Sequence, residues 1–93
     1  MHIGLLRIRL HLPGNTSLKG KRQVVQSLKE RVRQKTNVSI AEVDQLDSWQ
    51  EAVLAIVTVS NEQARVHQVL DTVLRMADDL PDAVLTENQI EML

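Results

Sequence analysis

The segment 17–35 repeats its apolar residues at the spacing of an α-helix, and this pattern constrains the fold more than any other in the chain. At about 100° per residue, the apolar side chains share one third of the helix circumference. They are Leu18, Val24, Val25, Leu28 and Val32. A helix with such a face must be covered by a sheet or by another helix. Ser17 is its predicted N-cap, because a hydroxyl there can accept from a free N–H of the first turn.

The opposite side of this predicted helix carries basic residues at steps of three or four. The row consists of Lys19, Arg22, Gln26, Lys29 and Arg33. The segment holds seven of the eleven Lys and Arg residues of the chain and a single acid, Glu30. Lys21 is an exception, since it falls near the centre of the apolar stripe. We expect Lys21 to lie beyond the sheet edge or to extend its ammonium group to solvent.

The rest of the chain predicts four strands and a second helix. Residues 2–12 alternate, with Leu6, Ile8, Leu10 and Leu12 on one face and Arg7, Arg9 and His11 on the other. Residues 37–46 and 49–59 predict a hairpin that turns at Asp47-Ser48, and its second strand is apolar on both faces, as in a sheet centre. A stripe ending near Leu80 predicts a helix whose start, Ser60 to Gln63, has capping-box spacing. Residues 83–93 form a weaker last strand.

This order predicts one domain spanning residues 1–93, of the α+β class, with a ferredoxin-like βαββαβ sandwich. Right-handed crossovers place both helices on one face of a four-stranded antiparallel sheet whose central strands are the first and third. Arg7, Arg9 and His11 then lie on the uncovered face beside an apolar row of the third strand. An open apolar row is unfavourable in a monomer, so we expect a homodimer closed through that face or the strand edges.

Composition excludes several classes of function. The chain contains no cysteine, which rules out disulfides, thiolate metal sites and cysteine nucleophiles. No apolar run approaches 18 residues and no signal-peptide pattern opens the chain, so we expect a soluble cytoplasmic protein without a membrane segment. No Gly-rich phosphate loop, HExxH motif or suggestive Ser/His/Asp set is present. We therefore expect neither catalytic activity nor a metal or other cofactor.

Charge is divided unevenly along the chain. Residues 1–35 carry nine basic and one acidic side chain, a net charge of +8, and residues 36–93 carry two basic and eleven acidic ones, a net charge of −9. Two interpretations remain open. The basic half binds an anionic partner, or the two halves neutralise each other across the fold.

Two sequence runs resemble a known bacterial family. The runs Ser-Leu-Lys-Gly-Lys-Arg at 17–22 and Val-Ser-Ile-Ala-Glu-Val-Asp at 38–44, together with residues 5–19, resemble the YlxP-like family of small uncharacterised proteins, and the likeness covers essentially the whole chain. The resemblance implies the ferredoxin-like fold. It also implies a connection with RNA or the ribosome, because the family's genes often lie among translation factor genes. Gly20 and Gln23 depart from the family pattern, in which an acid and a basic residue are common, and Gln23 lowers the charge of the helix.

The candidate contacts to nucleic-acid phosphate are Lys19, Lys21, Arg22, Lys29 and Arg33. A row of about 14 residues along a helix spans roughly 20 Å, enough to follow a nucleic-acid backbone by shape and charge. We therefore expect an RNA- or ribosome-associated accessory module. The alternative for the row is a solvated helix face. The alternative function is a self-associating structural module, or a small-ligand-binding regulatory one, without nucleic-acid binding.

The remaining candidates lie on the sheet and the hairpin. Arg7, Arg9, His11 and Trp49 form a possible interface, and we expect the basic members to meet acids across a dimer contact. RNA binding by stacking on the sheet is not expected, because the chain has no Phe or Tyr. Trp49 is predicted to anchor one end of the core, with an interface hot spot as the alternative. Four acids lie about the hairpin. They form an exposed acidic group, a partner for the basic helix of another subunit, or a site for a hard metal ion. They are Glu42, Asp44, Asp47 and Glu51.

Overall fold

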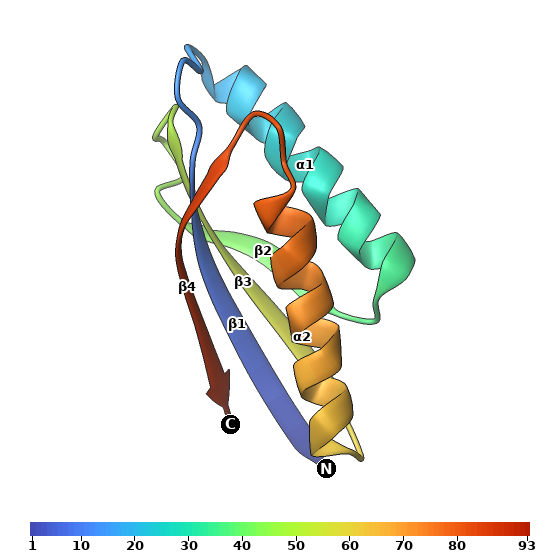
Figure 1. Cartoon of the computed structure of the whole chain (residues 1–93). Helices are drawn as coiled ribbons and strands as arrows, with labels where there is room; N and C mark the ends of the chain where they lie inside the picture. The colour runs from blue at the N-terminus through green and yellow to red at the C-terminus, as the bar shows by residue number, and fades with distance from the viewer.

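The computed structural model describes all 93 residues and confirms the predicted ferredoxin-like fold. Its elements are β1 (His2–His11), α1 (Leu18–Lys35), β2 (Ser39–Asp44), β3 (Glu51–Ser60), α2 (Gln63–Asp78) and β4 (Val84–Met92). The strands form one antiparallel sheet in the order β2-β3-β1-β4, so β1 and β3 are central, as predicted (Figure 1).

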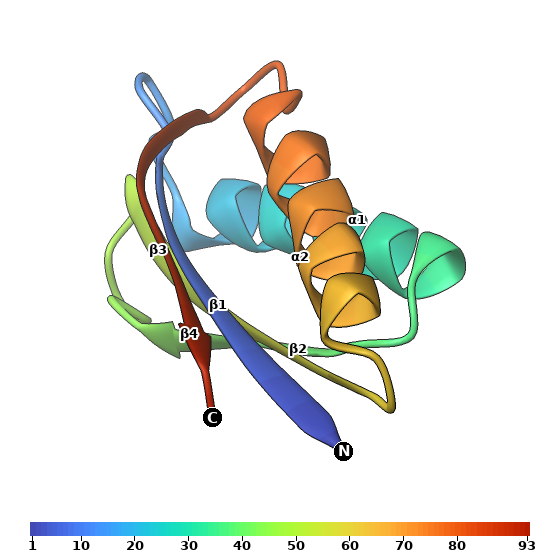
Figure 2. The ribbon, with the colours of Figure 1, turned by 60° about the horizontal axis from the view of Figure 1, so that its bottom comes forward.

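Both helices cover the same face of the sheet and the other face is open (Figure 2). The alternation of β1 turns Leu6, Ile8 and Leu10 toward the helices, where their side chains are fully buried. The register of β1 and β3 places Leu54 and Ile56 on the same side. The apolar stripe of α1 and that of α2 complete one core, which confirms the helical periodicity predicted for both segments.

The helix ends differ in how they are capped. The Ser17 hydroxyl accepts from the Gly20 N–H at 3.0 Å, which confirms Ser17 as the N-cap of α1. The capping box predicted at Ser60 and Gln63 is wrong. Helix α2 begins at Gln63 after an N-cap at Glu62 that makes no side-chain cap bond, and the Ser60 hydroxyl instead accepts from the Glu62 N–H at 3.1 Å.

The start of β1 runs unusually close to α2. A Cβ atom at Gly4 would lie 2.4 Å from Val66 Cγ1 and 2.9 Å from Leu70 Cδ1. Glycine is therefore required here by the approach of the helix to the strand. The absence of a side chain at Gly4 sets how near α2 lies to the centre of the sheet.

The predicted hairpin has a longer connection than expected. Residues 45–50 form a loop, so β3 begins at Glu51 and not at Trp49. The backbone of Gln45 adopts a left-handed conformation with φ of 56°, which residues other than Gly and Asn seldom occupy. The loop therefore has a defined conformation, and its hydrogen bonds with Lys21 and Ser48 are described below.

Candidate nucleic-acid interface

Helix α1 presents the predicted basic row to solvent. Lys19, Arg22, Gln26 and Arg33 are exposed and Lys29 is half-buried. None of the four cations of this row lies within 4.0 Å of a carboxylate. Glu30 is the one acid of the helix. It accepts a hydrogen bond from the uncharged Gln26 amide at 3.2 Å and forms no ion pair with the row. We call Lys19, Arg22, Lys29 and Arg33 the basic row.

The basic row is directed away from the acids of α2. Arg33 reaches the edge strand β2, where its Nη2 atom donates to the Ile40 carbonyl at 3.4 Å. Glu62, Asp71, Asp78 and Asp79 make no ion pair with α1. The acidic second half of the chain therefore does not neutralise this face through ion pairs.

Lys21 does not belong to this surface, and the prediction that it contacts phosphate is wrong. Its side chain is 0% exposed. The Nζ atom donates to the carbonyls of Gln45 at 2.8 Å, Leu46 at 3.3 Å and Glu51 at 3.1 Å. The ammonium group thus lies under the loop of residues 45–50, where all three of its N–H donors are used. Burial in the apolar stripe is possible because the loop supplies the acceptors that water would otherwise provide.

Glu42 supplies the counter-charge. Its Oε2 atom lies 2.9 Å from Lys21 Nζ. The Lys21 side chain is 0% exposed and the Glu42 side chain is 15% exposed. The geometry is that of an ion pair without a hydrogen bond, because Glu42 Oε2 has no hydrogen-bond partner while the three donors of Lys21 are directed at carbonyls. The sequence pattern places Glu42 with the hairpin acids and gives no sign of its pairing with Lys21, which depends on the packing of α1 against β2.

The open sheet face also pairs its charges within the chain. Glu51 accepts from Arg9 Nε at 3.3 Å and lies 3.0 Å from His11 Nδ1, and Arg7 Nη2 lies 3.9 Å from Asp44 Oδ2. These basic side chains were expected to meet acids across a dimer contact. The structure places acids of the same chain beside them instead, because the registers of β1, β2 and β3 bring these positions together.

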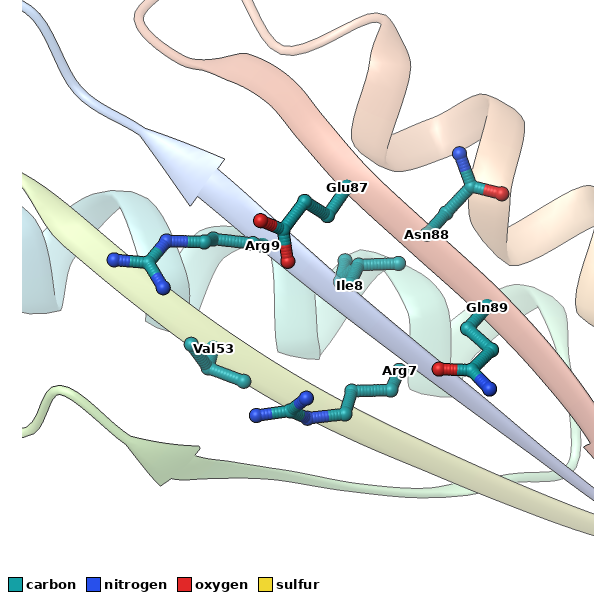
Figure 3. A pocket seen from close by; sticks show the side chains of 7 residues that line it. All are labelled: Arg7, Ile8, Arg9, Val53, Glu87, Asn88 and Gln89. Carbon is teal, nitrogen blue, oxygen red and sulfur yellow. The ribbon is translucent and has the colours of Figure 1, made fainter.

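A hollow of about 310 Å3 lies on this face and is lined by residues of β1, β3 and β4. Figure 3 shows Arg7 and Arg9 extending across β3 on either side of Val53, while Glu87 and Gln89 point toward β1. Val53 is buried although it lies on the face without helices. The hollow is thus floored by an apolar side chain and rimmed by charges of both signs.

Further along the open face lies an apolar row. The register places Ile3 opposite Val59 and Leu5 opposite Val57. Val57 and Val59 are 36% and 55% exposed, and Ile3 and Leu5 are half-buried. The predicted uncovered apolar row is therefore present at the end of the sheet remote from the hollow.

Trp49 does not anchor the core, and that prediction is wrong. The residue is 54% exposed and lies in the loop of residues 45–50 beyond the end of the sheet. The hairpin acids are likewise dispersed, since Glu42 faces Lys21 and Glu51 faces Arg9 and His11. No group of three or more His, Asp or Glu side chains is placed to hold a metal ion. Neither helix is sufficiently long and apolar to span a bilayer.

The fold and this surface define a small α+β domain of the ferredoxin-like class with an unpaired cationic helix face. The chain belongs to the family described as protein of unknown function (DUF503), whose model matches residues 3–90. It is similar to the uncharacterized protein YlxP of Bacillus subtilis (strain 168), with 36% identity over 75 residues that cover 81% of this chain and 82% of that protein. This confirms the family resemblance read from the sequence.

A solved structure supports the fold. The de novo designed protein Foldit4 superposes with a TM-score of 0.58 over 98% of this chain and 96% of the designed one, at 14% identity. A likeness at this identity shows a shared backbone arrangement and carries nothing about function.

Proposed function

We propose that this protein is a non-catalytic, RNA- or ribosome-associated accessory module that binds RNA phosphates through the basic row of α1. The observation that carries the proposal is the absence of any carboxylate within 4.0 Å of Lys19, Arg22, Lys29 or Arg33. Four cations without ion-pair partners along one helix face favour the approach of an anionic partner. The first turn of α1 contains no acid, although acids there would stabilise the helix through its dipole.

The geometry of the row suits contacts with a nucleic-acid phosphate backbone better than recognition of a base sequence. The row runs from Lys19 to Arg33, or roughly 20 Å along α1. Contacts of this type fix position by charge and shape and carry little sequence information. A-form RNA is recognised mainly through shape, phosphate and 2′-hydroxyl contacts, so structured RNA and ribosomal subunits are the ligands to test first.

Charge reversal on the row is expected to abolish binding. The variant Lys19→Glu/Arg22→Glu/Lys29→Glu/Arg33→Glu should lose affinity for ribosomal subunits and structured RNA by at least about 100-fold, because four phosphate contacts become repulsive. For the unaltered protein, log K should fall against log salt concentration with a slope of about −3. Filter binding or fluorescence anisotropy between low and physiological salt measures both quantities, after circular dichroism has established that the variant folds.

Arg65 and Arg75 provide the matched control. Both are exposed on α2 and neither forms an ion pair. Arg65→Glu/Arg75→Glu and Lys19→Glu/Arg22→Glu each reverse two charges, so they change the net charge equally. Equal loss in these two variants would mean that net charge alone governs binding, and no binding by the unaltered protein at low salt would remove the proposal.

A second candidate function, self-association, is favoured by the apolar row on the open sheet face. We propose that a second copy covers Ile3, Leu5, Val57 and Val59, because exposed contiguous apolar rows on sheets mark interaction sites. Val57→Lys should convert the dimer to a monomer in sedimentation equilibrium. Val43→Lys, which alters an exposed valine on β2 outside this row, should leave the dimer intact. A protein that is already monomeric at all concentrations tested would exclude this candidate.

A further inference from the structure

Trp49 is the only aromatic residue of the chain, and it is placed in solvent. The chain has one Trp and neither Phe nor Tyr, and Trp49 is 54% exposed. Large aromatic side chains lose favourable burial when left in water, and exposed ones are concentrated at binding surfaces. The exposure of Trp49 therefore points to a ligand or partner that covers the indole.

The loop that carries Trp49 is held by hydrogen bonds from the buried Lys21 side chain and by a hydrogen bond within the loop segment. The buried ammonium of Lys21 holds the carbonyls of Gln45, Leu46 and Glu51. The Ser48 hydroxyl accepts from the Glu51 N–H at 3.1 Å. The indole is thus presented on a preorganised loop, which lowers the ordering entropy that binding would otherwise require.

The same loop is tied to the start of α1. The Asn15 amide nitrogen donates to the Ser17 carbonyl at 2.8 Å and also to the Trp49 carbonyl, and the Gln50 amide donates to the Asn15 carbonyl at 3.2 Å. Figure 1 shows the two connections, residues 12–17 and 45–50, at the same end of the molecule. Trp49 is therefore held beside the first turn of α1, where the basic row begins with Lys19.

Gly20 leaves room for the Asn15 side chain in this arrangement. A Cβ atom at position 20 would lie 2.3 Å from Asn15 Oδ1. Glycine within the first turn is unfavourable for a helix, but here it leaves the space that the Asn15 side chain occupies. Glycine at position 20 thus leaves room for the Asn15 side chain, which ties the Trp49 loop to the start of α1.

The charges around Trp49 leave it accessible to an anionic ligand. Three of the four hairpin acids face cations of the fold, Glu42 facing Lys21, Glu51 facing Arg9 and Asp44 facing Arg7. Asp47 alone has no ionic partner. Trp49 therefore lies near one carboxylate without an ionic partner and near the start of α1, whose basic row forms no ion pair.

We infer that Trp49 is a stacking platform for an unpaired base of an RNA whose phosphates follow the basic row. The inference rests on the proposed function and narrows its ligand to RNA with single-stranded or looped-out bases. An exposed indole stacks on any base, and a neighbouring cationic track holds the phosphates, which is the combination that single-strand binders use. Stacking takes place at the loop beyond the sheet, and the sheet face remains free of bases.

The test uses the full chain and two RNA probes, a short oligoadenosine and a blunt-ended RNA duplex of equal phosphate number. Trp49→Leu should weaken binding of the oligoadenosine about tenfold and leave duplex binding within about twofold, because only the single strand offers unpaired bases along its length. Trp49→Phe should recover part of the loss. The emission of the unaltered protein comes from Trp49 alone, so oligoadenosine should quench it and the duplex should not.

A second variant separates base stacking from docking of an apolar protein surface. Leu46 is 54% exposed in the same loop, and Leu46→Ser should leave oligoadenosine binding unchanged. Equal weakening by Leu46→Ser and Trp49→Leu, or emission that does not change at saturating oligoadenosine, would overturn the stacking platform. If Trp49→Leu binds normally while reversal of the basic row abolishes binding, the platform fails and the proposed function stands. If the unaltered protein binds neither probe, both fail.

Discussion

Replacing Lys21 by methionine is expected to destabilise the fold by about 3–5 kcal/mol, the usual effect of removing one partner from a buried ion pair. Methionine fills a similar volume but leaves Glu42 facing no charge and three carbonyls without donors. Domains of this size have about 5–15 kcal/mol of stability, so this loss is a large fraction of it. Urea denaturation followed by far-ultraviolet circular dichroism should show the midpoint falling by about 2 M.

Lys19→Met is the control, because Lys19 is an exposed lysine two residues away on the same helix. It should change the free energy of unfolding by no more than about 0.5 kcal/mol. If Lys21→Met does not fold at all, Glu42→Gln gives a milder measurement, since Lys21 keeps its three carbonyls. Equal midpoints for Lys19→Met and Lys21→Met would show that the buried ammonium contributes nothing.

Gly4→Val is expected to cost about 3 kcal/mol or more, at or above the upper end of typical overpacking effects. The first added atom alone would approach Val66 Cγ1 to 2.4 Å, and valine adds two further carbons. Both β1 and α2 contribute side chains to one packed core, so neither can retreat without opening other contacts. The effect would appear as a lowered thermal midpoint and a lowered urea midpoint.

A double substitution tests whether the contact with α2 is the cause. Gly4→Ala and Val66→Ala should each destabilise, the first by crowding and the second by leaving a cavity. Combined, they should destabilise less than the sum of the two, because the new methyl group enters the space that Val66 vacates. Strict additivity would contradict the close approach of β1 and α2 as the reason for glycine at position 4.

The architecture could be predicted from periodicity because both helices and the central strands have apolar faces of the correct period. The alternation in β1 and the stripe of α1 determine which faces are buried, and the doubly apolar β3 indicates a central strand. The basic row could be placed on a surface for the same reason. The lack of acid partners for the basic row could not be predicted, because it depends on how α1 is rotated relative to α2 and β2.

Lys21 and Trp49 show where pattern alone is insufficient. A lysine in an apolar stripe signals an anomaly, but its acceptors come from a loop 24 to 30 residues away in the chain. Trp49 was assigned to the core because tryptophan is usually well buried. The loop between β2 and β3 extends past the end of the sheet, so no core is available at that point. Both errors arise from one segment whose conformation is determined by long-range contacts.

The two edges of the sheet differ in how they resist aggregation. The edge strand β2 is six residues long and has a register irregularity between Glu42 and Asp44, so it offers little regular backbone to a foreign strand. The other edge, β4, is nine residues long and has its own irregularity near its start, opposite Arg9 and Leu10; along the regular remainder, Glu87 and Glu91 repel another strand of the same sequence. Protection by shape is independent of ionic strength, whereas protection by charge is screened by salt. Solubility in concentrated salt should therefore be limited by β4.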